Sequence, residues 1–128
     1  MKTRMIIVAA PSGAGKSSFV EKLAAEDNRL HDIITYTTRA MRNHESQGKP
    51  YFFIPKEEFE KKIKEDFFIE YALVHTNMYG TSYEQVNLAW AKNKVVIMDI
   101  DIQGVMTFKS KFPDAKTVFI LPPSIDEL

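Results

Sequence analysis

The first 25 residues constrain what this chain can fold into more than any other part of it. Residues 5–10 form an unbroken apolar run, as expected of a parallel strand that is buried on both faces. Residues 11–15 are rich in turn-forming types, and residues 17–25 carry apolar side chains at helical spacing. Strand, loop and helix in this order predict the opening unit of an α/β fold. The apolar side chains of the predicted helix are Phe19, Val20 and Leu23.

The loop of this unit has the composition of a phosphate-binding loop. Gly13 and Gly15 permit backbone dihedral angles that other residues avoid, so that successive N–H groups can converge on phosphate oxygens. The helix after the loop adds the positive end of its dipole. We expect Lys16 to bridge the outer phosphates of a nucleotide and the Ser17 hydroxyl to bind Mg²⁺. The strict motif has glycine where this chain has Ala10.

Residues 12–18 are the predicted contacts with the phosphates of ATP. They are Ser12, Gly13, Ala14, Gly15, Lys16, Ser17 and Ser18. The alternative explanation is a solvated glycine-rich turn beside a surface lysine. The position of the loop between a buried strand and a helix favours the phosphate site.

Two further strands are predicted towards the end of the chain. Residues 95–98 form a second buried apolar run, residues 105–112 have the pattern of a helix, and residues 117–121 have that of a third strand. Strands separated by helices predict right-handed crossovers. The expected core is therefore a parallel sheet with helices on both faces.

Asp99 comes directly after the second of these apolar runs. An acidic residue at the carboxyl end of a parallel strand can anchor Mg²⁺ through water beside a phosphate loop. Asp101 points to the same side if the strand continues. A strand-end aspartate by itself is more often a helix N-cap or a solvated terminus. Combined with the loop, Asp99 is predicted to bind the metal through water.

The middle of the chain has a different pattern. Short β-rich pieces occupy residues 33–36, 51–54 and 68–74, and a helix is predicted at residues 57–64. Residues 82–91 then predict a helix that leads back to the core and opens with a capping box. The residues of the capping box are Ser82 and Gln85.

This pattern predicts a small β-rich subdomain inserted into an α/β core. Residues 1–34 would form the first part of the core, residues 35–91 the inserted subdomain, and residues 92–128 the second part of the core. A capping box at residues 124–127 predicts one more helix, which the sequence does not complete. Either the chain is a fragment, or a partner supplies the rest of the structure.

Composition argues against several classes of partner. The chain has 17 Lys plus Arg and 17 Asp plus Glu, so no net charge attracts it to nucleic acid or to an anionic membrane. It contains no cysteine, which excludes disulfides and thiolate metal sites and suits a reducing cytoplasm. The apolar run near Met1 is too short for a signal peptide or a membrane span. We expect a cytoplasmic protein, and a homodimer is compatible with the sequence.

Polar residues of the inserted segment indicate a second phosphate site. Arg39 and Arg42 lie three residues apart, and the planar guanidinium suits bidentate phosphate binding. The hydroxyls of Tyr51 and Tyr79 could complete such a clamp, and Glu70 could accept two N–H groups from a base. Each residue also has a simpler explanation. The arginines could be merely exposed, Tyr51 could be a strand aromatic, and Glu70 could pair with a lysine.

Taken together, these motifs resemble those of the guanylate kinases, from Ile6 almost to Leu128. The order and spacing of the matching segments agree closely with that family. They are residues 10–17, residues 37–39 with Arg42, Gly48 with Tyr51, and residues 68–71, 79–82, 99–104 and 119–124. The resemblance implies ATP-dependent phosphorylation of GMP or dGMP, with Mg²⁺ and by direct in-line transfer.

The resemblance also implies roles for individual residues. The residues it places at GMP are Thr35, Arg39, Arg42, Tyr51, Glu70, Tyr79, Gly80, Thr81, Asp99 and Asp101. The GMP phosphate would be held by Arg39, Arg42, Tyr51 and Tyr79. The guanine would lie against Thr35, Glu70 and Thr81, and the two aspartates would lie near Mg²⁺ and the acceptor nucleotide. The residues implied for catalysis are Lys16, Arg39, Arg42 and Asp99.

The assignment of guanine has a physical basis. A carboxylate such as that of Glu70 accepts from the adjacent N–H and NH₂ donors of guanine, whereas adenine presents an acceptor at its N1. A buried carboxylate left without those donors costs on the order of 1–3 kcal/mol or more. Glu70 therefore predicts a preference for GMP over AMP.

The chain departs from the family pattern at three positions and in its length. Met41 stands in place of a usual proline, Met78 in place of a frequent tyrosine, and Tyr36 in place of a small residue or histidine. Met78 would loosen the phosphate clamp. The family continues beyond this length with a lid and an adenine-binding segment, and lid arginines are worth roughly 10³–10⁵ in rate. We expect the 128 residues to bind GMP and phosphate but to turn over weakly or not at all.

Two other functions stay open. The chain could be a guanylate-kinase-like module that binds protein ligands without catalysis, or a kinase for another nucleoside monophosphate. Lys16 and the paired arginines argue against the first, because a protein-binding surface has no need of a phosphate loop. The three histidines, His31, His44 and His75, are not expected to act as bases, since phosphoryl transfer depends on positioning and electrostatics.

Overall fold

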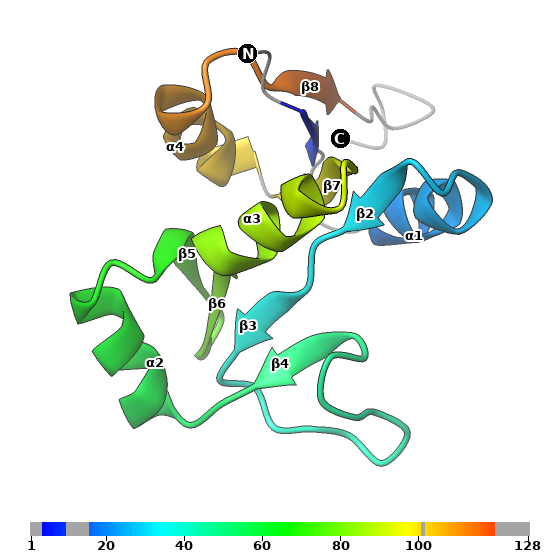
Figure 1. The fold of residues 1–128 in the computed structure, drawn as a ribbon. Helices are drawn as coiled ribbons and strands as arrows, with labels where there is room; N and C mark the ends of the chain where they lie inside the picture. The colour runs from blue at the N-terminus through cyan, green and yellow to red at the C-terminus, as the bar shows by residue number, and fades with distance from the viewer. Residues whose placement is uncertain (1–3, 10–15, 101, 120–128) are drawn as a thin grey trace, which may run out of the picture. The chain divides into compact units, whose positions relative to one another are not determined.

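The computed structural model of the protein describes residues 4–9, 16–100 and 102–119, which form two compact units. Unit 1 comprises Met1–Asp32 and Ala89–Leu128, and unit 2 comprises Ile33–Leu88 (Figure 1). Unit 2 corresponds to the inserted subdomain, whose predicted boundaries at residues 35 and 91 lie two and three residues from these limits.

Unit 1 is built on a four-stranded sheet with the strand order β2-β7-β1-β8. All its strand pairs are parallel, so the parallel α/β core that the sequence predicts is confirmed. The predicted strand at residues 33–36 is wrong in its limits, because the chain forms two strands there and residues 33 and 34 lie between them. The strands of the sheet are β1 (Met5–Ala9), β2 (Leu30–Asp32), β7 (Val95–Ile100) and β8 (Lys116–Phe119).

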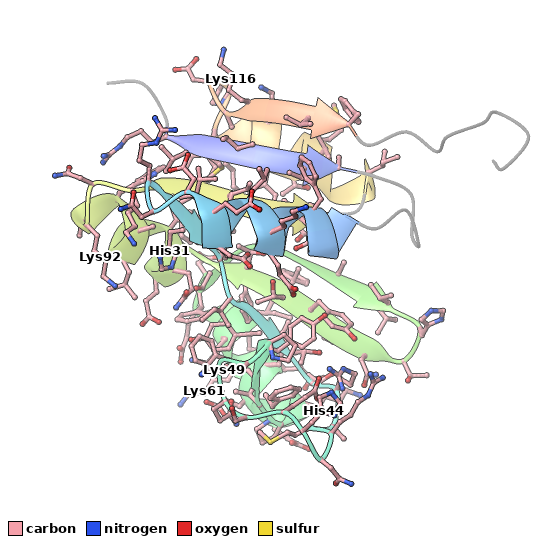
Figure 2. All side chains as sticks on the ribbon, turned by 90° about the vertical axis from the view of Figure 1, so that its right-hand side faces the viewer. His31, His44, Lys49, Lys61, Lys92 and Lys116 are labelled. Atoms are coloured by element: carbon pink, nitrogen blue, oxygen red, sulfur yellow. The ribbon has the colours of Figure 1, made fainter. Side chains whose placement is uncertain are left out.

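Helices cover both faces of this sheet, as predicted. Helix α1 (Lys16–Glu26) lies on one face and α4 (Ile102–Lys111) on the other (Figures 1 and 2). On the α1 side, Val20 packs against Val8 and Ile97 to form a fully buried cluster. The predicted apolar face of the first helix is too wide, since Phe19 is 41% exposed.

Unit 2 contains a second four-stranded sheet with the order β4-β3-β6-β5. Strands β3 and β4 are parallel, whereas β6 is antiparallel to both β3 and β5. The sequence pattern does not predict β6, because it lacks the alternation of apolar and polar side chains typical of a strand. The strands are β3 (Thr35–Thr37), β4 (Tyr51–Phe53), β5 (Phe68–Val74) and β6 (Asn77–Ser82).

Two helices accompany this sheet in the sequence. Helix α2 (Lys56–Lys64) has acidic residues in its first turn and lysines in its last, which complements the helix dipole. Helix α3 (Tyr83–Ala91) begins where predicted, and the Ser82 hydroxyl accepts from the N–H of Gln85 at 3.2 Å. This bond is the serine half of the predicted capping box. None of the described helices is long and apolar enough to cross a membrane.

The three histidines lie on β2 and in two connections of unit 2. His31 is on β2 beside Lys92 (Figure 2), and its pKa is lowered by burial and by Lys92 and Lys94. His44 lies in the connection between β3 and β4 (Figure 2). His75 is exposed in the tight turn between β5 and β6, with a φ of 59°.

Candidate nucleotide site

At the start of unit 1 a buried strand is followed by a helix, which is the order of elements around a phosphate site. Strand β1 ends at Ala9 and α1 begins at Lys16, so residues 10–15 connect the carboxyl end of a buried parallel strand to a helix N-terminus. That is the location at which backbone N–H groups and the helix dipole favour an anion. The predicted ATP contacts Ser12 to Gly15 lie outside the described residues, as do the side chains of residues 16–18, Asp101 and residues 120–128.

Asp99 lies at the edge of the sheet where this loop begins. It pairs with Val8, one residue before the end of β1, and both strands run towards the same edge. Because side chains alternate along a strand, Asp99 lies on the same face as Ile97, which is the face that α1 covers. Asp99 therefore lies at the carboxyl end of the sheet, next to the end of β1, and on the face that α1 covers.

A second carboxylate lies at this edge, and no sequence motif points to it. Asp32 ends β2 and pairs with Ile97, so it shares a face with Asp99. Burial, together with the smaller effects of the charges of Asp99 and Glu21, raises the pKa of Asp32 to about 6. A half-buried aspartate at a strand end has no distinctive sequence pattern, and only the pairing of β2 with β7 brings it here.

The carboxylates at this edge suit a hard cation. Oxygen donors are what Mg²⁺ prefers, and mutual repulsion between Asp32 and Asp99 is relieved by positive charge. Within the described part of the chain, no group of three or more acidic or histidine side chains could hold a metal by itself. A magnesium ion at this edge would thus depend on nucleotide phosphates and water for its other ligands.

The electrostatics of Asp32 lead to a testable pH dependence. Its folded-state pKa of about 6 exceeds the ordinary 3.8, so the folded protein binds the proton more tightly, and stability falls as pH rises from 4 through 6. Asp32→Asn removes the ionisation and should raise the free energy of unfolding at pH 8 by about 1–2 kcal/mol after allowance for solvent screening. Urea unfolding of both proteins at pH 4 and pH 8 measures this. The difference should vanish at pH 4, and an Asn variant no more stable at pH 8 would contradict the expectation.

In unit 2, the strand register separates the sheet into two chemically different faces. Tyr36 pairs with Gly80, which pairs with Tyr71, so these residues share one face. The ring of Tyr36 contacts those of Phe52 and Phe68 at centroid distances of 5.0 and 5.8 Å, which makes this face aromatic. The opposite face carries mainly hydroxyls and a carboxylate. Its residues are Thr35, Thr37, Tyr51, Phe53, Glu70, Tyr79 and Thr81.

The three residues that the resemblance places at guanine form one row across the second face. Glu70 on β5 pairs directly with Thr81 on β6. Thr35 precedes Tyr36, whose partner is Gly80, and so it lies opposite Thr81 in the antiparallel ladder. A carboxylate and two hydroxyls therefore line up over three adjacent strands. This row combines a carboxylate acceptor with two hydroxyls, which can accept and donate, on one face of the sheet.

A β-bulge gives Glu70 its orientation. Phe68 pairs with Ser82 and Glu70 with Thr81, so two steps along β5 oppose one step along β6. In an unbroken ladder, Glu70 would share the aromatic face with Phe68, because residues two apart point the same way. The bulge at Ile69, whose side chain is 1% exposed, turns Glu70 to the other face.

The predicted phosphate clamp also comes together on this face. The rings of Tyr51 and Tyr79 meet edge to face at 5.6 Å, and the Arg39 guanidinium lies 5.3 Å from the centre of the Tyr51 ring. Arg39 also lies 5.4 Å from the centre of the Phe53 ring. Arg42 is exposed, and its backbone N–H donates to the carboxylate of Glu45, which also pairs with Arg39.

Two threonines fix the turn that carries Arg39. The Thr37 hydroxyl donates to the carbonyl of Met78 at 2.9 Å and accepts from the Arg39 N–H at 3.1 Å. The Thr38 hydroxyl accepts from the Met78 N–H at 2.9 Å. Met78, expected to loosen the clamp through its side chain, thus contributes through its backbone, which any residue except proline could supply.

Gly80 has a packing role on the opposite face. A Cβ at this position would lie 2.7 and 2.8 Å from ring atoms of Phe68 and 3.0 Å from the Phe59 ring. The resemblance implies Gly80 as a GMP contact, but the direction of its missing side chain points to close packing. Glycine here lets the aromatic cluster approach the sheet.

Comparison with known proteins identifies the family of the chain. The family model described as guanylate kinase matches residues 2–128. The guanylate kinase of Bdellovibrio bacteriovorus is 70% identical over 128 residues, which are 100% of this chain and 69% of that protein. The guanylate kinase of Sodalis glossinidius is 49% identical over 127 residues, 97% of this chain and 61% of that protein.

A solved structure shares the fold as well as the sequence. The crystal structure of guanylate kinase from Anaplasma phagocytophilum superposes with a TM-score of 0.78 at 28% identity, over 98% of this chain and 63% of that one. The chain thus spans roughly three-fifths to seven-tenths of the length of these relatives. The family model covers nearly every residue, and the relatives match in sequence and fold. The chain belongs to the guanylate kinase family.

Proposed function

We propose that this protein binds GMP on the polar face of unit 2 and transfers to it the γ-phosphoryl group of ATP. The observation that carries the proposal is the arrangement of that face. A Glu70–Thr81 pair suited to guanine and a cluster of Arg39, Tyr51 and Tyr79 suited to phosphate lie on the same side of one sheet. GMP, or dGMP, needs both at once.

The proposed reaction is a direct in-line displacement. An oxygen of the GMP phosphate forms a bond to the γ-phosphorus of ATP, and the bond between that phosphorus and the β–γ bridging oxygen breaks, which releases ADP. The chain contributes charge and position: Lys16 would neutralise the outer phosphates of ATP, and Arg39 would hold the acceptor phosphate. No covalent enzyme intermediate is involved, and the site requires no histidine base.

Mg²⁺ would be held by the Ser17 hydroxyl and by Asp99 through water, next to the ATP phosphates, where it would neutralise developing negative charge. Asp32 would add a further negative charge on the same face of the sheet. A cytoplasmic location belongs to the proposal because ATP and GMP are cytoplasmic substrates.

Calorimetry of the full-length protein with GMP, AMP and guanosine tests the proposal. We expect GMP to bind at least about tenfold more tightly than AMP, because adenine does not offer the two adjacent donors that the Glu70 carboxylate can accept. Guanosine should bind more weakly than GMP, because it offers nothing to Arg39. Equal affinities for GMP and AMP would defeat the guanine assignment. If neither GMP nor ATP raised the melting temperature, the protein-binding alternative would replace the kinase.

A further inference from the structure

We propose that Glu45 is a positioning residue for the GMP phosphate, acting by holding the Arg39 guanidinium with one edge free for the ligand. Glu45 is not among the residues that the sequence motifs point to. This inference rests on the proposed function, because it concerns the phosphate part of the same site. The signal that the sequence does offer is an acidic residue close to two arginines, six residues after Arg39 and three after Arg42.

The carboxylate of Glu45 accepts two hydrogen bonds from the Arg39 guanidinium, a two-point grip. Nη1 of Arg39 donates to Oε1 at 3.1 Å, and Nη2 donates to Oε2 at 2.8 Å. The side chains are 15% exposed for Arg39 and 6% for Glu45, so water competes little for either. A bidentate pair of this kind fixes the plane of the guanidinium as well as its position.

The same carboxylate also anchors the backbone that carries the second arginine. The N–H of Arg42 donates to Oε1 of Glu45 at 2.9 Å. Oε1 therefore accepts from the Arg39 side chain and from the Arg42 main chain at once. Glu45 thereby sets the spacing between the two arginines that the phosphate clamp needs.

Among the described residues, the remaining contacts of Arg39 leave one edge of the guanidinium for a ligand. Its Nη1 also donates to the carbonyl of Ala40 at 3.1 Å, so both hydrogens of Nη1 and one of Nη2 are engaged. The Nε–H and the second hydrogen of Nη2 form the fork on the other edge, which matches two oxygens of a phosphate. Tyr51 and Phe53 lie against the same guanidinium and restrict its rotation.

Glu45 acts here as a permanent support rather than as a competitor of the phosphate. The hydrogen bond from Arg39 lowers its pKa to about 2, with a further contribution from the Arg42 backbone, so the carboxylate stays ionised at every working pH. It occupies the edge formed by Nη1 and Nη2, whereas the ligand would use the edge formed by Nε and Nη2. Both anions can therefore bind Arg39 together.

The test is Glu45→Gln in the full-length protein, with calorimetry for GMP and for guanosine. Glutamine keeps the shape but presents an NH₂ group to the guanidinium, so the two-point grip is lost. We expect GMP affinity to fall about tenfold and guanosine affinity to stay unchanged. Glu45→Asp, which keeps the charge at shorter reach, should recover part of the loss and serves as the second variant if the first does not fold.

A matched control is present in unit 1. Asp27 holds Arg29 with a similar bidentate grip, at 2.6 to 3.2 Å, on an exposed loop. Asp27→Asn removes a comparable ion pair outside the site and should leave the affinities for GMP and guanosine as in the wild type. A double-mutant cycle with Arg39→Lys adds a second check, since Glu45→Gln should change GMP affinity little once Arg39 is gone.

Three results would overturn the inference. GMP affinity that is unchanged in Glu45→Gln would show that the grip is dispensable, and tighter binding would show that the carboxylate competes with the phosphate. An equal loss for guanosine would mean a general structural role. If the wild type bound no GMP, the proposed function itself would fall and this inference with it. If the wild type bound GMP and Glu45→Gln bound it equally well, only the role of Glu45 would fall and the proposed function would stand.

Discussion

Glu70→Gln is expected to weaken GMP binding about 100-fold and to remove most of the preference for GMP over AMP. The carboxylate of Glu70 is the one charged group in the row that also contains Thr35 and Thr81. It can accept from both donors on the guanine edge. Glutamine of the same shape has only one oxygen to accept, and it turns a donor towards one of the two N–H groups.

Affinities of wild type and variant for GMP and AMP, measured side by side, give the result. Glu65→Gln on the same segment is the control, because Glu65 is exposed and lies before β5. It should leave both affinities unchanged. A Glu70→Gln protein that still preferred GMP over AMP would show that guanine is read by some other group. A loss confined to GMP, with AMP unaffected, is the signature of a lost acceptor.

The core of unit 1 could be predicted from the sequence because its strands are buried on both faces. Residues 5–10 and 95–98 are unbroken apolar runs, and β1 and β7 occupy almost the same residues. Strand β2 has no such run, because Leu30–Asp32 is short and ends in polar residues. It is a strand only because β7 offers it a partner, and pairing between distant segments cannot be read from local pattern.

The sequence could nominate residues for the candidate site but could not give their arrangement. Arg39, Tyr51 and Tyr79 could be chosen from their chemistry and from the family resemblance, and the structure brings them into contact. The orientation of Glu70 depends on the bulge at Ile69, which a simple alternation of side chains would not reveal. The roles of these residues towards GMP stay predictions until binding is measured.

The two residues that the sequence does not reveal, Asp32 and Glu45, act through contacts that arise only in the folded chain. Asp32 acquires its raised pKa from burial and from Asp99, which a neighbouring strand brings close. Glu45 matters through the conformation of the connection between β3 and β4. In that connection the Gln47 side chain also bonds the backbone of Phe53 in both directions, at 2.8 and 2.9 Å. Such loop contacts depend on geometry that composition does not encode.

A substitution at Gly80 separates effects on the packing of unit 2 from effects on ligand binding. Gly80→Ala should lower the free energy of unfolding by about 1–3 kcal/mol. The added methyl would lie within 2.8 Å of the Phe68 ring, which cannot swing away because it stacks on the fully buried Phe59 at 4.5 Å. The methyl points to the aromatic face, so no atom of it enters the proposed guanine row.

Urea unfolding measures the loss of stability, and a double-mutant cycle identifies its cause. Phe68→Leu removes the ring atoms that the methyl would meet, so the double variant should be more stable than the sum of the two single losses predicts. Strict additivity would mean that the strain lies elsewhere. Under conditions where Gly80→Ala is folded, GMP should bind it nearly as well as the wild type. A large loss of GMP affinity in a stably folded variant would show instead that Gly80 contacts the ligand. The aromatic face lies on the opposite side of the sheet from the phosphate clamp, so altered packing there would not touch the clamp directly.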